Sequence, residues 1–247
     1  RAATALGTAS GKAAQLELRA LLRSMNSYYT NRIEGEHTRP SDIERALQQD
    51  FSADADLARK QRLAVAHIRT EQSCEAEVGR RVAASGEEGA RRLYSADALT
   101  GLHGALFSDL PPGDLKLSDG SLMKPGQIRK RAVAVGRHEA PTPKSLPAFI
   151  ERWAGAYGRV RRGEASIVAL AASHHRLAWM HPFLDGNGRV ARLHTHLLLH
   201  AWGLSNGLWS PLRGFARSEE RYKALLQAAD EHRRGDLDGR GNLTQAG

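Results

Sequence analysis

Cysteine is almost absent from this sequence, since Cys74 is the only one among 247 residues. A single cysteine excludes an intrachain disulfide and a zinc site built from several cysteines. We therefore expect a reduced, cytoplasmic chain. No run of about 18 apolar residues occurs, which excludes a membrane-spanning helix, and we expect no membrane partner. No signal peptide is visible, and because the chain begins with Arg1 rather than Met, we expect further sequence upstream.

Acidic residues are the minority among the charged residues. There are 27 Asp and Glu against 36 Lys and Arg, so the net charge is +9. A basic chain suits nucleic acid, a membrane surface or anionic ligands. The arginines, however, are spread along many segments, with short clusters at 129–131, 159–162 and 233–234. This distribution favours solvated helix faces and some phosphate contacts over a general nucleic-acid-binding role.

Apolar residues recur at helical spacing along most of the chain, which predicts an all-α fold. The expected helices cover residues 12–33, a segment starting at 41, 55–84, 95–107, 145–160, 164–179, 188–202 and 218–232. Gly35 occupies the position of a C-terminal glycine after the first helix. Ser41 and Glu44 form the capping-box pattern, and Ser95 and Ser145 are expected N-caps.

Residues 110–147 differ because they are rich in proline and glycine. Loops of this length in compact domains tend to be functional or disordered. Within this segment, residues 132–135 followed by Gly136 give a short strand signal. We expect a small β-hairpin attached to a helical body. The tail around residues 235–241 is polar and glycine-rich, which indicates a linker towards a further domain.

The segment 181–192, between two apolar helices, has the features of a phosphate-binding loop. Gly186 and Gly188 allow the backbone to approach a ligand closely. The amides of such a turn, at the start of a helix, form an anion-binding nest. Arg189 and Arg192 are three residues apart and share a face of that helix. Two guanidiniums beside a helix N-terminus suit a polyphosphate better than a carboxylate.

Other side chains of the same loop suit chemistry on that phosphate. Asp185 offers a hard oxygen ligand where Mg²⁺ bridging phosphates would lie. His181 has an unperturbed pKa near neutrality, which suits a general base. We expect Phe183 to fix the loop in the core.

Three competing motifs are disfavoured. Gly186, Gly188 and Ala191 match a dinucleotide-binding fingerprint, but the preceding segment is helical and the acidic partner about 20 residues on is missing. A Walker loop would need Lys followed by Ser or Thr after the last glycine, and here Gly188 is followed by Arg189 and Val190. His196 and His200 are four residues apart but lack an intervening Glu, so we expect ordinary helix-face histidines rather than a metal site. The same expectation applies to the neighbouring histidines His194, His174 and His175.

Residues 181–192 match the signature HPFxDGNGRxxR at every specified position, and on this basis the chain resembles Fic (filamentation induced by cyclic AMP) domains. The resemblance implies an all-α Fic-type bundle with a β-hairpin flap. It places the Fic core at 95–232, helices at 1–94 before it, including an inhibitory helix at about 13–35, and a polar tail or linker at 233–247.

The resemblance implies a protein adenylyltransferase that moves AMP from Mg-ATP to a Ser, Thr or Tyr hydroxyl of a target protein. In that role His181 deprotonates the hydroxyl and Asp185 binds Mg²⁺. Arg189 would hold the β or γ phosphate and Arg192 the γ phosphate. The remaining phosphate-cradling residues would be Gly186, Asn187 and Gly188.

Two further regions follow from the same resemblance. The flap edge, on which a target would lie as an added strand, comprises Arg131, Ala132, Val133, Ala134 and Val135. Tyr222 falls where such domains often place adenine-pocket residues.

Thr30, Glu34 and Gly35 fit the Fic inhibitory pattern [S/T]xxxE[G/N] near the N-terminus. This resemblance implies the subclass whose inhibitory helix precedes the core. Glu34 would pair with Arg192 and block the guanidinium that the γ phosphate needs. Glu36, directly after the pattern, is an acidic departure that would alter the docking of the helix.

Alternative functions remain open at this point. Glu34 could instead position a water that removes AMP from a modified target. The chain could also be the sensory module of a DNA-binding regulator, with nucleic acid bound only through a domain outside this sequence. A homodimer is plausible for any of these.

Overall fold

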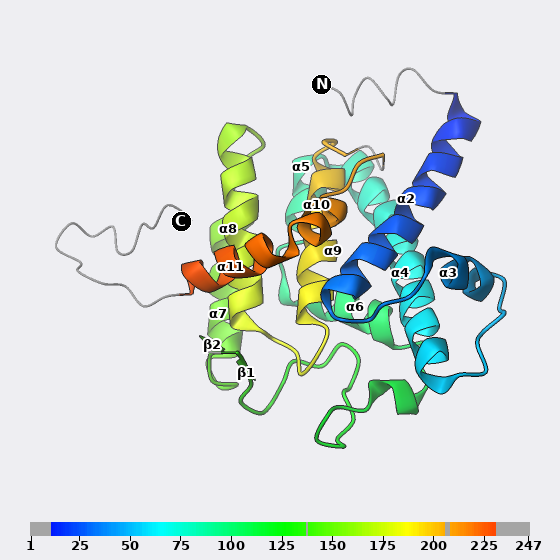
Figure 1. Ribbon diagram of the computed structural model, residues 1–247. Coiled ribbons are helices and arrows are strands. Elements are labelled where there is room, and N and C mark those ends of the chain that lie inside the picture. Colours follow the sequence, from blue (N-terminus) through cyan, green and yellow to red (C-terminus); the bar gives the residue numbers. More distant parts are fainter. Residues whose placement is uncertain (1–10, 137, 206–207, 231–247) are drawn as a thin grey trace.

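The computed structural model describes residues 11–136, 138–205 and 208–230, and helices dominate it (Figure 1). The helices are α2 (Lys12–Ile33), α3 (Pro40–Leu47), α4 (Ala55–Ser85), α5 (Glu87–Arg91), α6 (Ala96–Phe107), α7 (Leu146–Tyr157), α8 (Glu164–Met180), α9 (Asn187–Ala201), α10 (Leu212–Arg217) and α11 (Glu219–Ala229), with one 3₁₀ turn at Pro112–Leu115. The expected all-α class with a small hairpin is confirmed.

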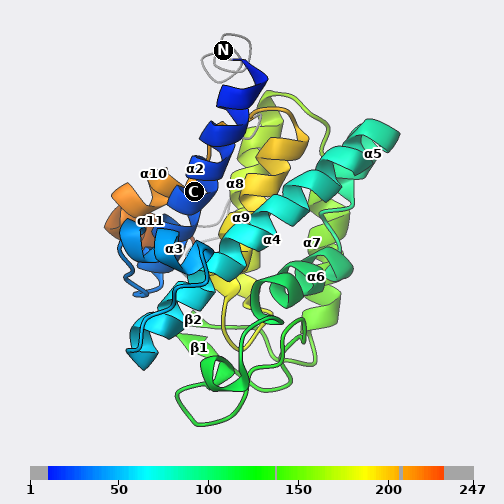
Figure 2. The same ribbon diagram turned by 90° about the vertical axis from the view of Figure 1, so that its right-hand side faces the viewer.

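Helix α9 is the central element of the fold. It packs against α4, α6 and α8, and it contacts α2 and α5 as well. Its leucines Leu193, Leu197 and Leu198 are fully buried, and so are several polar side chains around them. A helix that is buried on most of its circumference lies in the core. Figure 1 shows α9 among the longer helices, and in Figure 2 α4 crosses in front of it.

Helix α2 docks through polar residues rather than through its leucines. Its buried side chains include Asn26, Ser27 and Thr30, whereas Leu16 and Leu21 are exposed. The helical spacing predicted the extent of α2 correctly, but not the face that it buries. Because the buried face is polar, hydrogen bonds and ion pairs hold α2 against α4 and α9, and α2 also contacts α10.

The hairpin is shorter than expected. Strand β1 (Ala134–Val135) pairs antiparallel with β2 (His138–Glu139), with Ala134 opposite Glu139. Among the described residues these two strands form a sheet of their own. The outer edge of β1 therefore has no strand beside it there.

Three details of the sequence prediction are wrong. Helix α3 begins at Pro40 with no side-chain cap, because proline is well suited to the first helical position; Ser41 lies inside the helix and makes no capping box. Ser145 precedes α7 but makes no capping hydrogen bond. Helices α5 and α10 were not predicted, since both are short, and α11 ends at Ala229.

The expected N-cap at Ser95 is confirmed, and the expected tail cannot be compared with the structure. Ser95 caps α6 by accepting a hydrogen bond from the amide of Ala98 (3.0 Å), as predicted. The expected tail at 233–247 lies outside the described residues.

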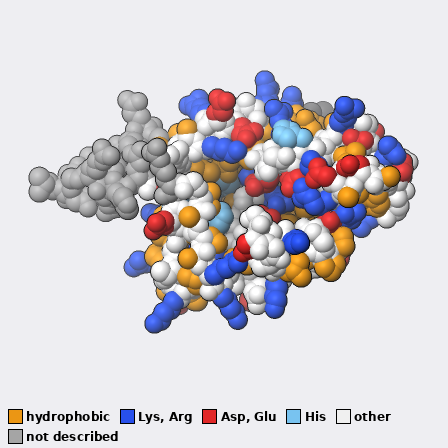
Figure 3. Space-filling view, turned by 60° about the horizontal axis from the view of Figure 1, so that its bottom comes forward, with side chains coloured by type: hydrophobic (Ala, Val, Ile, Leu, Met, Phe, Trp, Pro, Cys, Tyr) orange, Lys and Arg blue, Asp and Glu red, His pale blue; other side chains and the backbone are white. Residues whose placement is uncertain are grey.

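Within the described ranges, none of the helices has the length and apolarity needed to cross a bilayer. Basic side chains are scattered over the face shown in Figure 3 and are interspersed with acidic ones, as the spread of arginines predicted.

Candidate active site

The loop between α8 and α9 is held in one conformation by its own side chains. His181 ends α8 in the left-handed region, with φ 48° and ψ 59°. Such a conformation costs energy in a non-glycine residue and persists only where the surroundings enforce it. Asn187 provides part of this support: its side chain accepts from the amide of Phe183 and donates to the carbonyl of Phe183, both at 2.9 Å. Phe183 is fully buried, and its ring stacks on that of His103 with 4.0 Å between the ring centroids.

This arrangement refines the expected role of Asn187. Because both polar atoms of its side chain bind Phe183, the side chain braces the loop, and the backbone amide is the group of Asn187 left to bind a phosphate. Gly186 has φ 76°, and a Cβ there would lie 2.5 Å from the ring of Phe107. Glycine is therefore required at this position for both conformation and space.

The tautomer of His181 follows from its hydrogen bond. Its Nδ1 lies 3.2 Å from the carbonyl oxygen of Ala178. A carbonyl can only accept, so Nδ1 carries the proton and Nε2 holds the lone pair. Burial lowers the pKa of His181 below its ordinary value, although the Ala178 carbonyl opposes this shift. His181 is therefore a neutral base with a free Nε2 near neutral pH.

The first turn of α9 offers unpaired donors for an anion. The amides of residues 187–189 have no intrahelical acceptor because of their position, and no side chain caps the helix. Arg189 is buried over the ring of Phe107, 5.0 Å from its centroid. Its Nε and Nη1 have no hydrogen-bond partner among the residues that the structure describes. Buried guanidinium donors without partners are costly, and a phosphate would satisfy them.

Asp185 is suited to holding a hard cation beside this turn. Its side chain is 48% exposed. Oδ1 accepts from the amide of Gly186 at 2.6 Å, and the contacts to Arg189 are long, at 3.4 and 3.5 Å. Carboxylate oxygens that face solvent can complete the mixed water and phosphate shell that Mg²⁺ prefers.

The end of α2 covers the second arginine of the loop. Arg192 retains only 2% of its side-chain exposure and forms an ion pair with Glu34, which retains 26%. The Arg192 guanidinium also donates to Thr30, from Nε to Oγ1 at 2.8 Å and from Nη2 to the carbonyl at 3.1 Å. The structure thus brings Arg192 together with Thr30 and Glu34, which lie 162 and 158 residues before it in the sequence. Gly35 ends α2 with φ 80°.

The charges of this pair reinforce each other. Burial alone would raise the pKa of Glu34, but Arg192 and Arg189 outweigh it and hold the pKa below its ordinary value. Burial likewise opposes the charge of Arg192, and Glu34 and Tyr222 outweigh it, so the pKa of Arg192 is raised. Both partners are therefore ionised over the whole neutral range.

Tyr222 contacts this arginine as part of a network that the sequence did not predict. Thr195 donates to the carbonyl of Ala191 (2.9 Å) and lies 2.7 Å from Nδ1 of His174. His174 Nδ1 is therefore the donor, and its Nε2 accepts from the Tyr222 hydroxyl at 2.8 Å. His174 is buried within this network. The adenine-contacting role of Tyr222 stays a prediction.

Arg129 connects the flap to the catalytic loop, and sequence reasoning missed it. Its guanidinium donates to the carbonyls of His181 (2.7 Å), Arg131 (2.9 Å) and Pro141 (2.5 Å). Its backbone amide donates to the carbonyl of Pro182 at 2.9 Å. A buried arginine that binds carbonyls fixes the spacing between the hairpin and His181. In the sequence it was indistinguishable from the neighbouring basic residues.

The expected flap edge lies on the surface. Arg131 is paired with Asp119 and donates to Ser121 at 3.0 Å. The strand residues Ala134 and Val135 are exposed. The described arrangement leaves this edge accessible, and docking of a target there stays a prediction.

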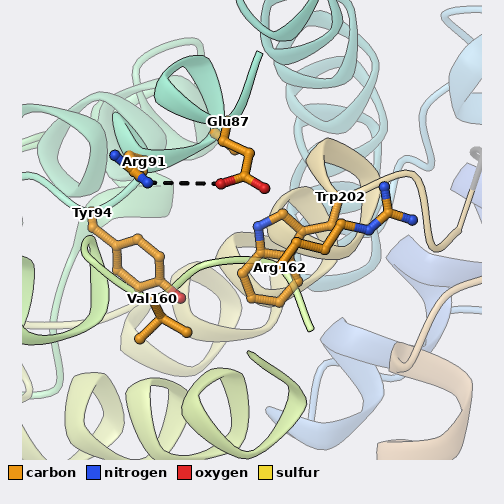
Figure 4. Close-up of a pocket in the computed structure, with 7 residues that line it drawn as sticks. Glu87, Arg91, Tyr94, Val160, Arg162 and Trp202 are labelled. Carbon is orange, nitrogen blue, oxygen red and sulfur yellow. Dashed lines mark ion pairs between the residues drawn. The ribbon is translucent and has the colours of Figure 1, made fainter. Parts of the chain in front are cut away.

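A separate small pocket does not belong to this site. It lies between α5, the loop that joins α7 to α8, and Trp202, with Glu87 and Arg91 on one wall (Figure 4). Its cavity of about 10 Å³ is the space of one water molecule. It is too small for a nucleotide.

The central helix, the donor-lined loop at its N-terminus and the adjacent hairpin define a helical domain built to hold an anion next to a neutral histidine. The sequence profile of the Fic/DOC family matches residues 93–199, so this part of the chain is a Fic domain.

Relatives and solved structures agree with this assignment. The chain is 32% identical over 109 residues to the protein named protein adenylyltransferase Fic from Drosophila ananassae, and the same holds for that of Drosophila melanogaster. These matches cover 43% of this chain and 20% and 21% of the relatives, so the chain spans about a fifth of their length. A Fic family protein from Desulfovibrio desulfuricans matches with a TM-score of 0.65 at 18% identity, over 89% of this chain and 59% of that one. A Fic domain containing signaling protein from Bacteroides thetaiotaomicron matches with a TM-score of 0.67 at 18% identity, over 94% and 81%. These two structures show the shared fold.

Proposed function

We propose that the chain is a protein adenylyltransferase, which transfers AMP from ATP to a Ser, Thr or Tyr hydroxyl of a target protein. The observation that carries the proposal is the neutral imidazole of His181 at one end of a loop whose other end presents buried Arg189, with its Nε and Nη1 unpartnered among the described residues. The names of the Drosophila relatives support the same reaction.

In this proposal each residue of the loop has one step. The phosphates would bind the amides of the first turn of α9, with Arg189 and Arg192 neutralising the terminal phosphates. His181 Nε2 would take the proton of the acceptor hydroxyl as its oxygen bonds to the α-phosphorus. The bond from that phosphorus to the leaving pyrophosphate breaks in the same displacement. Positioning and charge neutralisation supply most of the acceleration in such reactions.

Asp185 is the residue that would hold Mg²⁺. The ion, when bound, would neutralise phosphate charge next to the reacting centre. The exposed carboxylate, its long contacts to Arg189 and the adjacent amides all fit this role.

We further propose that α2 inhibits this activity. Glu34 and Thr30 occupy the donors of Arg192 that a γ phosphate would use. Gly188 lies directly under this contact, since a Cβ there would meet both Glu34 and Arg192. ATP could then bind only in an unproductive position, or only after the end of α2 moves away.

The direct test of the reaction uses the Glu34→Gly variant. A cell lysate is incubated with this variant and ATP, and proteins are then searched by mass spectrometry. We expect an adduct with the mass of AMP on Ser, Thr or Tyr of a target or of the enzyme itself. Absence of any nucleotide adduct, with the variant folded and binding ATP, would overturn the proposal.

The pair of Glu36 and Arg59 gives a graded test of inhibition. The Arg59 guanidinium donates to both carboxylate oxygens of Glu36, at 2.9 and 2.6 Å, and so ties the end of α2 to α4. Partly exposed pairs contribute about 0.5–1 kcal/mol, so Arg59→Gln should raise self-labelling roughly 2- to 5-fold. Arg45→Gln, which breaks the exposed pair with Asp50, is the matched control and should change nothing. An equal rise in both variants would argue against a specific latch.

The pH dependence of the activated enzyme follows from His181. Its pKa is lowered, chiefly by burial, and a general base works only when unprotonated. Activity of Glu34→Gly should therefore persist as pH falls to 6.5 and decline only below it. Removing Glu34, which raises the pKa of His181, moves the decline further down. The measurement is the pH profile of kcat/KM, and a decline centred above 6.5 would contradict this assignment.

A further inference from the structure

A buried cluster of histidines and carboxylates lies where α2, α4 and α9 meet. His67, Glu71 and Glu75 are spaced four residues apart and form one stripe of α4. His196 of α9 faces them, one turn beyond Arg192. All four side chains are nine-tenths or more buried, and His67 is only 1% exposed. Such a set is costly in a core unless its polar atoms have partners.

The polar atoms of this cluster are not all satisfied. Within the described residues, neither ring nitrogen of His67 has a hydrogen-bond partner, and Oε2 of Glu71 has none either. These two groups face each other, with His67 Nδ1 3.7 Å from Glu71 Oε2. That separation is too long for a hydrogen bond. Two potential ligand atoms are therefore directed at one another without contact.

The separations within the cluster resemble those between ligands of one ion. His196 Nε2 lies 2.9 Å from Glu75 Oε1 and 3.5 Å from Glu71 Oε1. One ligand atom each from Glu71, Glu75 and His196 can be chosen within 4.8 Å of one another. Ligands about 2.0–2.2 Å from a tetrahedral zinc ion lie roughly 3.4 Å apart. For an ion to bind, His196 and Glu75 would give up the hydrogen bond that they now share, and His67, which faces Glu71, would supply the fourth ligand.

Side chains of α2 bind both carboxylates. Arg23 binds the Glu75 oxygen that does not contact His196, whereas Asn26 binds the Glu71 oxygen that lies nearest His196. Arg23 donates to Glu75 Oε2 at 2.9 and 2.7 Å. Asn26 donates to Glu71 Oε1 at 2.7 Å. Groups that orient ligating carboxylates in this way are characteristic of the surroundings of metal sites. They also connect the cluster to α2, the helix that carries Glu34.

We propose that His67, Glu71, Glu75 and His196 form a structural site for one divalent transition-metal ion of the zinc class, which ties α2 to α4 and α9. Two imidazoles and two carboxylates favour zinc or a similar ion over Mg²⁺ or Ca²⁺. Four protein ligands in a buried site leave no position for a substrate, which indicates a structural role. Binding releases the proton that His196 and Glu75 now share. The proposal is independent of AMP transfer.

The binding test uses the whole chain after treatment with a chelator. The protein is titrated with Zn²⁺ and, separately, with Co²⁺, and bound metal is measured by elemental analysis after gel filtration. We expect one ion per chain, a tetrahedral absorption spectrum with Co²⁺ and a rise in Tm with Zn²⁺. In hydrogen exchange, the loaded protein should protect the amides of α2 more strongly. A wild-type chain that is folded and retains less than about a tenth of an equivalent of either ion overturns the proposal.

Variants locate the site. His67→Gln and His196→Gln should each lose the ion, and Asn26→Ala should bind it about 10- to 100-fold more weakly. His194→Gln is the matched control, because His194 is also buried on α9 but bonds to the carbonyl of Leu93 at 3.0 Å; it should retain one ion. Retention by folded His67→Gln and His196→Gln would place the ion elsewhere and contradict the proposal. If these variants do not fold, the wild-type titration and the weakened affinity of Asn26→Ala decide the question.

Discussion

Replacing Glu34 with glycine is expected to raise self-labelling of the chain with ATP about 30-fold or more. The reason is the charge pair with Arg192, whose guanidinium is almost completely buried. Removing one partner of such a pair typically costs about 2–5 kcal/mol, and the lower value corresponds to roughly a 30-fold change. In this chain the substitution destabilises the inhibited state, in which Glu34 pairs with Arg192. The guanidinium of Arg192 then becomes available to the γ phosphate.

The measurement uses ATP labelled at the α phosphate, with the wild-type chain beside the variant. Arg32→Gly is the matched control, because it places a glycine in the same last turn of α2 at an exposed position. It introduces the same backbone freedom without touching Arg192. Glu34→Gln, which keeps the helix end and removes the charge, should give an intermediate rise.

Two results would contradict inhibition by Glu34. One is an equal increase in Arg32→Gly, which would show that fraying of the helix is sufficient. The other is loss of label from a previously modified target only when Glu34 is present, which would indicate that Glu34 positions water for removal of AMP. Each result separates a specific ion pair from an alternative that uses the same residue.

The loop at 181–192 was the most predictable part of the molecule. Its residues are adjacent in the chain, so their joint geometry depends on local factors: a glycine at positive φ, a helix start and a spacing of three residues. These factors predicted where α9 begins to within one residue. They did not reveal that the Asn187 side chain would brace Phe183.

The spacing of residues along the sequence could not predict contacts between distant segments. His196 was compared with His200 because the two are four residues apart, whereas the structure sets it against Glu75, which is 121 residues away. Both His196 and His194 are fully buried, which spacing alone did not indicate. Arg129 was missed for a related reason. Every residue has a backbone carbonyl, so the sequence does not indicate which arginine will donate hydrogen bonds to several of them.

Helix α2 shows the same limit in another form. Its leucines predicted the helix but lie largely on its exposed side, while its polar residues dock it. A polar docking face depends on partners supplied by other helices, such as Glu71 and Glu75 of α4. Amphipathic periodicity reports only apolar burial, so it cannot identify such a face.

Replacing His181 with alanine in the Glu34→Gly background is expected to reduce AMP transfer by about 10²- to 10⁴-fold, the range of general-base contributions. Nδ1 of His181 donates its proton to the carbonyl of Ala178, so the lone pair on Nε2, on the other side of the ring, is the one that can accept the proton of the hydroxyl. No water can replace this base at the same position without losing its orientation. Binding of ATP should change little, because the phosphate donors belong to α9 rather than to His181.

A second substitution removes an ambiguity about the backbone. His181 adopts a left-handed conformation, in which alanine is strained but asparagine is tolerated. His181→Asn should therefore keep the loop and still lose transfer to a similar extent. His37→Ala, at an exposed histidine outside the site, should keep full activity. If His181→Asn retained most of the transfer while His181→Ala did not, the histidine would be positioning the loop, and the proton would leave the acceptor by another route.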